Sequence, residues 1–507
     1  MTGPSLSRKQ FLQSLSALGA AGLLPAAAAE REVGQAPEKA DKAAAPPVTA
    51  EAAAFVIRTG WNDLPPELVE LGKQHILDAL GLALAGQQAE SGPIVRRYLA
   101  TLGLAKGPAT VLGTGLRLAP RFAAFANGVA IHADDFDDTQ LAVAKDRVYG
   151  LLTHPTVTAM SAALAVAEAK GASGRDFMLA YHLGVEVETK ISEAISPRSY
   201  EGGFHSTPMC GVFGSATAAA KLNGLDAATL CRCYGLAGAQ SSGLRENFGT
   251  MTKPFQAGHG AEGGVVAADL AGLGWTAAPD ILEAKRGFFA AFGGGFDAAA
   301  IVGKWGKPWS FLTPGISIKP YPSGSLTHPA MDELLDLIRG NGIKAEEVAA
   351  VRVGTNKQML NTLIHHEPKT GLQGKFSMEY CMAVLLIDGR AGLAQFTDAS
   401  VDRPAVQDML HRVEFYNAPE ADAAGADKMR SLVEITLKDG RKFSGQADFA
   451  KGSPQKPMSF DDAVEKFQGC AEYARLPKPR AAAIVAQVKD LASLKDIRGL
   501  TRNLVFG

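Results

Sequence analysis

The chain has 507 residues, of which 47% are hydrophobic and 20% are charged, and this is enough to build a large core in two or three domains. Its 51 Lys and Arg residues nearly balance its 52 Asp and Glu residues. This balance leaves no basic surface that would favour nucleic acid or an anionic membrane as a partner, so any anion must be bound at a local site.

The N-terminus is laid out like an export signal. Residues 7–12 read Ser-Arg-Lys-Gln-Phe-Leu, and an apolar run at 15–24 and a stretch of small residues follow. The basic motif resembles the twin-arginine translocation motif with lysine in place of the second arginine, while the short run and Pro25 argue against a membrane anchor. We therefore expect residues 1–29 to direct export to the periplasm and residues 30–49 to form a disordered spacer. Without a working signal, the protein would stay in the cytoplasm.

The next stretch predicts closely packed helices. Between residues 51 and 314, apolar residues return every three or four positions, which is the period of a helix with one buried face. Leu68, Leu71 and Leu82, for example, share one face of a helix that two prolines open at 65 and 66. Alanine and glycine are frequent throughout the stretch, so the helices can approach one another closely.

An acidic cluster interrupts this helical pattern. Residues 132–139 read His-Ala-Asp-Asp-Phe-Asp-Asp-Thr, and four carboxylates within five positions repel one another unless water, a metal or a cationic substrate site compensates them. Single cations or imidazoles in apolar or glycine-rich surroundings follow at His154, His205, Lys253 and Lys319. Together these features predict an enzyme that acts on a polycarboxylate.

The pattern changes to mixed helix and strand after residue 320. Three segments alternate apolar and polar residues as half-buried strands do: 348–353, 413–416 and 433–437. Asp439-Gly440 then predicts a hairpin turn into 442–449, and helices lie between the strands and after them. We expect a mainly α-helical domain of residues 50–315 and 455–507 and a smaller α+β lid domain of residues 316–454. A cleft between two domains is where ligands prefer to bind.

Short polar motifs are spread over about 250 residues of the chain. In order they are Asn127-Gly128, His132, Asp135-Phe136-Asp137-Asp138-Thr139, Thr153-His154-Pro155, Gly203-Phe204-His205, Lys253-Pro254-Phe255 with Gly258 and His259, Ile318-Lys319-Pro320-Tyr321-Pro322, and Lys375-Phe376-Ser377 ahead of Tyr380. In this order they resemble the MmgE/PrpD family, which includes 2-methylcitrate dehydratase and cis-aconitate decarboxylase. The resemblance covers residues 50–475 and implies a helical domain with an α+β lid, commonly a homodimer, and no metal or other cofactor.

The resemblance also implies which residues carry the chemistry. The family's catalytic residues match Asp135, Thr139, His154, His205 and Tyr380, and its carboxylate-binding lysines match Lys253 and Lys319. Imidazole is well suited to exchange protons near neutral pH. His154 and His205 each precede a predicted helix start, where free backbone N–H groups favour an anion. If the segment between Asp135 and Thr139 is helical, these two side chains share a face.

These observations predict a cofactor-independent lyase for a small di- or tricarboxylic acid that works by acid/base catalysis. It would dehydrate a 2-methylcitrate-like hydroxy acid or decarboxylate a cis-aconitate-like acid. The lysines would stabilise enolate-like charge, the histidines, Asp135 and Tyr380 would exchange protons, and closure of the lid would exclude water.

Other functions stay open on the sequence alone. The same groups could epimerise or isomerise a dicarboxylate, or an exported protein could bind polycarboxylates without catalysis. Residues 134–138 also fit the D-D-x-x-D motif with which all-helical terpene synthases hold magnesium, but no second metal motif accompanies it and the lid would be unexplained. The segment between Thr139 and His154 looks longer than in the best-known dehydratases and could reshape the substrate pocket.

Overall fold

The computed structural model describes residues 46–140, 153–425 and 428–506. The predicted export signal and most of the predicted spacer lie outside the described residues, and so does most of the segment between Thr139 and His154. Helix α2 (Val48–Arg58) begins inside the predicted spacer. Val48 and Thr49 are buried, and Thr49 N donates to Glu283 Oε2 at 3.0 Å, so the spacer prediction runs too far at its C-terminal end. Among the described helices, none has the length and hydropathy needed to cross a membrane.

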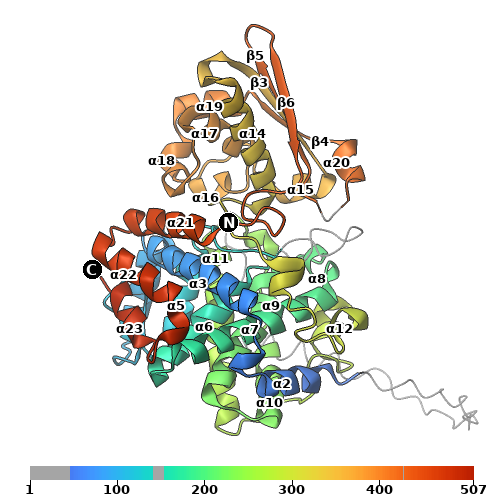
Figure 1. Ribbon diagram of the computed structural model, residues 1–507. Helices are drawn as coiled ribbons and strands as arrows, with labels where there is room; N and C mark the ends of the chain where they lie inside the picture. Colours follow the sequence, from blue (N-terminus) through green and yellow to red (C-terminus); the bar gives the residue numbers. More distant parts are fainter. Residues whose placement is uncertain (1–45, 141–152, 426–427, 507) are drawn as a thin grey trace, which may run out of the picture. The chain divides into compact units, whose positions relative to one another are not determined.

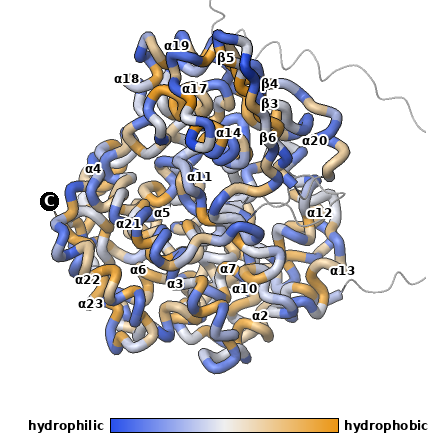
Figure 2. Tube along the Cα trace, turned by 45° about the horizontal axis from the view of Figure 1, so that its top comes forward, coloured by the Kyte–Doolittle hydropathy of each residue, from blue (hydrophilic) through white to orange (hydrophobic). Residues whose placement is uncertain are grey.

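Two hydrophobic cores organise the described chain. The first collects buried residues from Val48 to Ile316 and again from Phe467 to Leu504, and the second from Leu326 to Leu437. A mainly helical part thus returns after an α+β part, as the sequence predicts, and the predicted fold class is confirmed. Hydrophobic and hydrophilic residues are interleaved along the traces of both parts (Figure 2), so each element can offer an apolar side to its core.

Helices build the first part almost entirely. Its longer helices are α2, α3 (Pro66–Ala85), α4 (Ser91–Thr101), α5 (Pro120–His132), α6 (Pro155–Lys170), α7 (Gly174–Ile195), α9 (Ser206–Asn223), α10 (Ala227–Gly238), α11 (Thr252–Gly272), α21 (Phe460–Tyr473) and α22 (Lys478–Lys489). Shorter elements are α8 (Arg198–Glu201), α12 (Phe288–Gly293), α13 (Ala298–Ile301), α23 (Arg498–Thr501) and the strands β1 (Ala109–Thr110) and β2 (Arg117–Leu118). Helix α6 is buried along nearly its whole length, which explains why its sequence shows no polar stripe.

The second part, called the lid below, is a four-stranded sheet with helices. Its elements are α14 (His328–Asn341), β3 (Val348–Thr355), α15 (Lys357–Thr362), α16 (Gly371–Gly374), α17 (Met378–Asp388), α18 (Asp398–Val401), α19 (Pro404–Leu410), β4 (Val413–Asn417), α20 (Pro419–Ala423), β5 (Ser431–Leu437) and β6 (Lys442–Ala447). The strand order is β4-β3-β5-β6, with β3 and β4 parallel and the other pairs antiparallel. Helices α14 and α17 lie beside this sheet (Figure 1). The predicted hairpin is present, since β5 and β6 pair on either side of Gly440, whose φ is 90°.

A close approach of two helices positions the candidate site. A Cβ added to Gly128 of α5 would lie 2.9 Å from the Gly258 Cα of α11, and one added to Gly258 would lie 2.6 Å from the Phe125 carbonyl oxygen. The two helices run antiparallel here, because His132 at the end of α5 meets Lys253 at the start of α11. Glycine at both positions therefore lets the end of one helix meet the start of the other.

Candidate active site

The four carboxylates after α5 each have a different partner. The α-helix ends at His132, and Asp135 adopts a left-handed conformation with φ of 49°, which Asp tolerates better than most residues. The segment from Asp135 to Thr139 is therefore not helical, so the condition under which these two side chains would share a helix face is not met. The contacts join Asp134 to Lys375 at 3.3 Å, Asp135 to Lys253 at 2.6 Å and to Lys319 at 3.0 Å, Asp137 to His132 at 2.8 Å, and Asp138 to His75 at 2.6 Å. Repulsion within the cluster is thus relieved by the protein's own cations and donors.

Two buried lysines share one carboxylate oxygen. Lys253 and Lys319 are 4% and 2% exposed, and both ammonium groups contact Asp135 Oδ1. Lys319 also donates to the Asp135 backbone carbonyl at 2.7 Å. Burial alone would raise the pKa of Asp135, but the charges of the two lysines outweigh it and hold that pKa well below its ordinary value. Asp135 is therefore ionised at neutral pH and neutralises part of the positive charge of the empty site.

His154 lines a cavity, and among the described residues only one of its two ring nitrogens has a hydrogen-bond partner. It is the N-cap residue of α6, and its Nδ1 lies 2.8 Å from the Asp138 carbonyl oxygen. A carbonyl oxygen only accepts, so Nδ1 carries the proton and Nε2 carries a lone pair. Burial holds the pKa of His154 well below its ordinary value. The resting imidazole is therefore neutral, with a basic nitrogen 3.8 Å from Asp135 Oδ1.

His205 is fixed in the same tautomer. It is the N-cap residue of α9, and its Nδ1 lies 2.7 Å from Gln256 Oε1. The Gln256 amide nitrogen donates to the Leu244 carbonyl at 3.2 Å, which turns the amide oxygen toward His205. The His205 Nε2 then has no hydrogen-bond partner among the described residues. This ring lies behind the cavity lining, with its centroid 5.8 Å from that of His132.

One cavity gathers most of the predicted site residues. Its volume is about 40 Å³, and its lining includes Asp135, Thr139, His154, Lys253 and Lys319. The helical part also supplies Tyr200 and Phe248, and the lid side supplies Ser325, Leu326, Thr362, Leu363 and Phe376. Thr139 is held by a backbone bridge to Ser317, which ties the acidic cluster to the segment that carries Lys319. Three helices begin at this site, α6, α9 and α11, and helix N-termini favour anions.

Tyr380 does not belong to this group, contrary to the prediction. It is fully buried in the lid core, its hydroxyl donates to the Gln395 carbonyl, and its ring packs edge-on against Phe396. Tyr380 is therefore a structural residue of the lid. Sequence reasoning alone cannot separate these roles, because a tyrosine on an apolar helix fits both.

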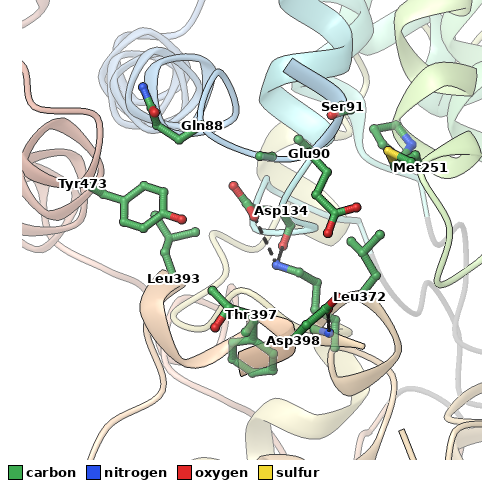
Figure 3. A pocket seen from close by; sticks show the side chains of 16 residues that line it. Gln88, Glu90, Ser91, Asp134, Met251, Leu372, Leu393, Thr397, Asp398 and Tyr473 are labelled. Atoms are coloured by element: carbon green, nitrogen blue, oxygen red, sulfur yellow. Dashed lines mark hydrogen bonds and ion pairs between the residues drawn. The ribbon is translucent and has the colours of Figure 1, made fainter. Parts of the chain in front are cut away.

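Lys375 reaches the acidic cluster instead, although no sequence pattern predicted this contact. Its ammonium donates to the Asp134 backbone carbonyl at 2.7 Å and is only 2% exposed as a side chain. The pair borders a second cavity of about 190 Å³. Glu90 and Asp134 of the helical part and Leu372 and Asp398 of the lid line it (Figure 3). Lys375 thus connects the lid to the turn that carries Asp135.

The ligand atoms of four side chains in this cluster lie within 4.8 Å of one another, as in a metal site: His132, Asp135, Asp137 and His154. Lone pairs of two of these side chains are already engaged, since Asp135 Oδ1 contacts two ammonium groups and Lys253 lies 2.7 Å from His132 Nε2. Two ammonium groups at these distances repel a divalent cation. The donor set therefore suits a carboxylate ligand better than a metal.

Comparison with known proteins decides the family. The sequence matches the MmgE/PrpD N-terminal domain over residues 50–300 and the MmgE/PrpD C-terminal domain over residues 321–491. The chain belongs to the MmgE/PrpD family. The predicted family is thus confirmed, and the two matched domains agree with a two-part fold of helical body and lid.

Three relatives within the MmgE/PrpD family are cis-aconitate decarboxylases. The protein from Homo sapiens is 28% identical over 451 residues, which cover 86% of this chain and 90% of the relative. The protein from Mus musculus is 28% identical and covers 87% of this chain and 90% of the relative. The protein from Aspergillus terreus is 28% identical and covers 91% of this chain and 97% of the relative. The family and these relatives support a lyase-type function.

Proposed function

We propose that the protein is a cofactor-independent lyase that decarboxylates a cis-aconitate-like tricarboxylate. The observation that carries the proposal is the sharing of one cavity by Lys253, Lys319 and the free Nε2 of His154. Two cations that face a carboxylate-binding cavity suit a polyanion, and a nearby imidazole can move a proton. The names of the relatives favour decarboxylation among the reactions that such a site can perform.

The chemistry follows from the charges in the site. The bond between an allylic CH₂ group and its carboxylate breaks and releases CO₂, and the electron pair moves through the C=C bond toward a carboxylate at the far end. Lys253 and Lys319 stabilise the enolate-like charge that develops there. A proton is then added to the carbon next to that carboxylate, which completes the unsaturated dicarboxylate product.

His154 is the proposed proton donor. Its Nε2 is unprotonated in the empty site because burial lowers the pKa of the imidazole. Binding of a polyanion beside the ring favours the imidazolium form, so His154 can take up a proton with the substrate and deliver it to the carbanion. Thr139 borders the same cavity and can orient a substrate oxygen through its hydroxyl.

The cavity must widen to admit such a substrate. Its volume of about 40 Å³ is room for one or two water molecules, less than a tricarboxylate needs. Since the lid supplies Ser325, Leu363 and Phe376 to the lining, movement of the lid opens the site and its return excludes water.

Dehydration of a 2-methylcitrate-like acid is the second candidate, because a resting Nε2 lone pair on His154 also suits removal of a proton next to a carboxylate. NMR of the purified protein with cis-aconitate, citrate and 2-methylcitrate in deuterated water separates the two reactions. Decarboxylation releases CO₂ and places one deuterium in the product, whereas dehydration converts a hydroxy acid into an alkene with no loss of carbon. Unchanged spectra for all three acids would refute both candidates.

Export and dimer formation complete the proposal. The basic and apolar layout of residues 1–29 supports export to the periplasm, which cell fractionation tests. An exposed apolar group supports a homodimer, since Tyr98 of α4 and Phe255 of α11 are 52% and 49% exposed and both rings contact Phe125 edge-on. Phe255→Glu is expected to convert a dimer to a monomer in size-exclusion chromatography with light scattering.

A further inference from the structure

A buried chain of three side chains leads away from the cavity. His132 Nδ1 lies 2.8 Å from Asp137 Oδ2, and His132 Nε2 lies 2.7 Å from Lys253 Nζ. The His132 and Asp137 side chains are 0% and 1% exposed. Lys253 lines the cavity, whereas neither His132 nor Asp137 does. Any effect of these two residues on a bound ligand must therefore pass through Lys253 or another neighbour.

The direction of each hydrogen bond in this chain follows from chemistry. An ionised carboxylate only accepts, so the proton between Asp137 and His132 belongs to Nδ1. The Nε2 of a neutral imidazole then carries a lone pair, and the Lys253 ammonium donates to it. A second N–H of Lys253 goes to Asp135 Oδ1 at 2.6 Å. Among the described residues, no acceptor is found for the third N–H, and Lys253 can offer it to a ligand in the cavity.

The surroundings support this distribution of protons. Burial lowers the pKa of His132, and Asp137 only partly opposes it. Burial would raise the pKa of Asp137, but the facing imidazoles of His132 and His154 outweigh it and lower that pKa. Burial also lowers the pKa of Lys253, against the charge of Asp135. The other groups that face this chain are Lys319 and the rings of His205, Phe248 and Phe376.

We propose that His132 and Asp137 are positioning residues that act through Lys253. Asp137 keeps the His132 proton on Nδ1, and the resulting Nε2 acceptor holds one N–H of Lys253, so that another points at a substrate carboxylate. The role in turnover rests on the proposed function, while the tautomer and its effect on anion binding do not. A carboxylate that fixes a histidine tautomer in this way is known to be important where the histidine acts directly on a substrate or a metal.

Three variants test the proposal. His132→Leu removes the acceptor, His132→Gln retains a carbonyl oxygen near the position of Nε2, and Asp137→Asn removes the charge that holds the proton on Nδ1. We expect kcat/KM to fall about 10- to 100-fold in His132→Leu and Asp137→Asn, the usual loss when such an orienting partner is removed. His132→Gln should recover at least half of that loss on a logarithmic scale. Asp448→Asn is the matched control, because it removes an ion-paired carboxylate of the lid that contacts Arg430 at 2.7 Å.

The pH profile separates positioning from a structural role. Without the Nε2 acceptor, the Lys253 ammonium loses a stabilising partner, and the alkaline limb of kcat/KM should move to lower pH in His132→Leu but not in His132→Gln. If both His132 substitutions lowered kcat/KM equally and left the alkaline limb unmoved, His132 and Asp137 would have only a structural role. Activity of Asp137→Asn within threefold of the wild type would also overturn the proposal.

Two measurements do not need turnover. Nitrogen NMR of protein labelled with ¹⁵N-histidine, with His132 assigned by loss of its signals in His132→Gln, should show Nδ1 protonated and Nε2 unprotonated. Calorimetry with propane-1,2,3-tricarboxylate, which cannot dehydrate or decarboxylate in the proposed way, should show binding about tenfold or more weaker in Asp137→Asn. If the wild type turns over no acid but these two results hold, the proposed function is refuted, while the positioning of Lys253 by His132 and Asp137 is supported. A proton on His132 Nε2 in the wild type would refute the proposed positioning of Lys253.

Discussion

Asp135→Asn provides the sharpest test of the charge arrangement. The substitution removes the one carboxylate that contacts both Lys253 and Lys319, at 2.6 and 3.0 Å, while Asn tolerates the left-handed backbone at this position at least as well as Asp. Loss of one partner from a buried ion pair costs about 3–5 kcal/mol. The Asn oxygen can still accept one N–H, so we expect a cost near the lower end, about 3 kcal/mol.

The expected change in melting temperature follows from the size of the folded unit. An unfolding entropy of about 2 cal/mol/K per residue over roughly 450 described residues amounts to about 1 kcal/mol/K. The Tm of Asp135→Asn should therefore fall by about 3 °C in differential scanning calorimetry. Glu414→Gln is the control: it breaks an exposed pair with Arg352 whose side chains are 57% and 45% exposed, and such pairs contribute about 1 kcal/mol or less.

A ligand should reverse much of this loss. In the wild type, a substrate carboxylate competes with the charge of Asp135 for the lysines, whereas in Asp135→Asn no charged competitor remains at this position. Saturating propane-1,2,3-tricarboxylate should therefore raise the Tm of the variant more than that of the wild type and narrow the gap between them. A variant Tm within 1 °C of the Glu414→Gln control, or a larger ligand shift in the wild type, would refute the reasoning.

Three further predictions concern single residues. Lys253→Ala and His154→Ala should each lower kcat by about two to four powers of ten with unchanged far-UV circular dichroism, and turnover within threefold of the wild type would contradict their roles. Tyr380→Phe should leave kcat within threefold and lower stability by about 1 kcal/mol, since the hydrogen bond to the Gln395 carbonyl is lost. A hundredfold loss of kcat would instead place Tyr380 among the catalytic residues. Burial lowers the pKa of His182 from 6.5 to about 3. As the pH falls below 6.5, His182 is therefore protonated in the unfolded chain but stays neutral in the native state. The free energy of unfolding should fall by about 2 kcal/mol by pH 5 for this reason. In urea titrations, His182→Leu should lose less stability than the wild type between pH 7 and pH 5, and an equal loss would exclude His182 as the cause.

The sequence predicted the elements of the fold better than their pairing. The alternating segments 348–353, 413–416 and 433–437 fall within β3, β4 and β5, because one buried face per strand leaves a period of two in the sequence. The parallel pairing of β3 with β4 could not be predicted in this way. It depends on how α15 to α19 fold back between the two strands, and no local pattern encodes that.

The candidate site was likewise predictable only in part from the sequence. Motif order was enough to bring Asp135, Thr139, His154, Lys253 and Lys319 to one cavity, because a shared family fold carries motif positions with it. It did not reveal that Tyr380 points into the lid core while Lys375, five positions earlier, reaches Asp134. Side-chain direction at the start of a buried helix depends on tertiary packing, which an apolar sequence does not specify.

The contact between His132 and Lys253 shows why no partner inside the protein could be predicted for the acidic cluster. The two residues are 121 positions apart, and they meet because α5 and α11 approach closely at Gly128 and Gly258. Gly128 and Gly258 both belong to the sequence motifs, but a glycine within a helix does not show which other helix packs against it. The repulsion among the four carboxylates predicted that other groups compensate them. Distant segments supply Lys253, Lys319, Lys375 and His75, and His132 pairs with Asp137.

The sharing of Asp135 by two lysines gives a physical reason for the proposed preference for polycarboxylates. In the empty site, one oxygen of Asp135 satisfies both ammonium groups, so a ligand must compete with an internal anion that is already in place. A monocarboxylate can replace only one of these contacts and leaves the other lysine with Asp135. A ligand with two or three carboxylates can engage both lysines at once, and its additional charge also favours the imidazolium form of His154. In the proposed function, the arrangement would therefore couple recognition of a polyanion to the supply of the proton for the reaction.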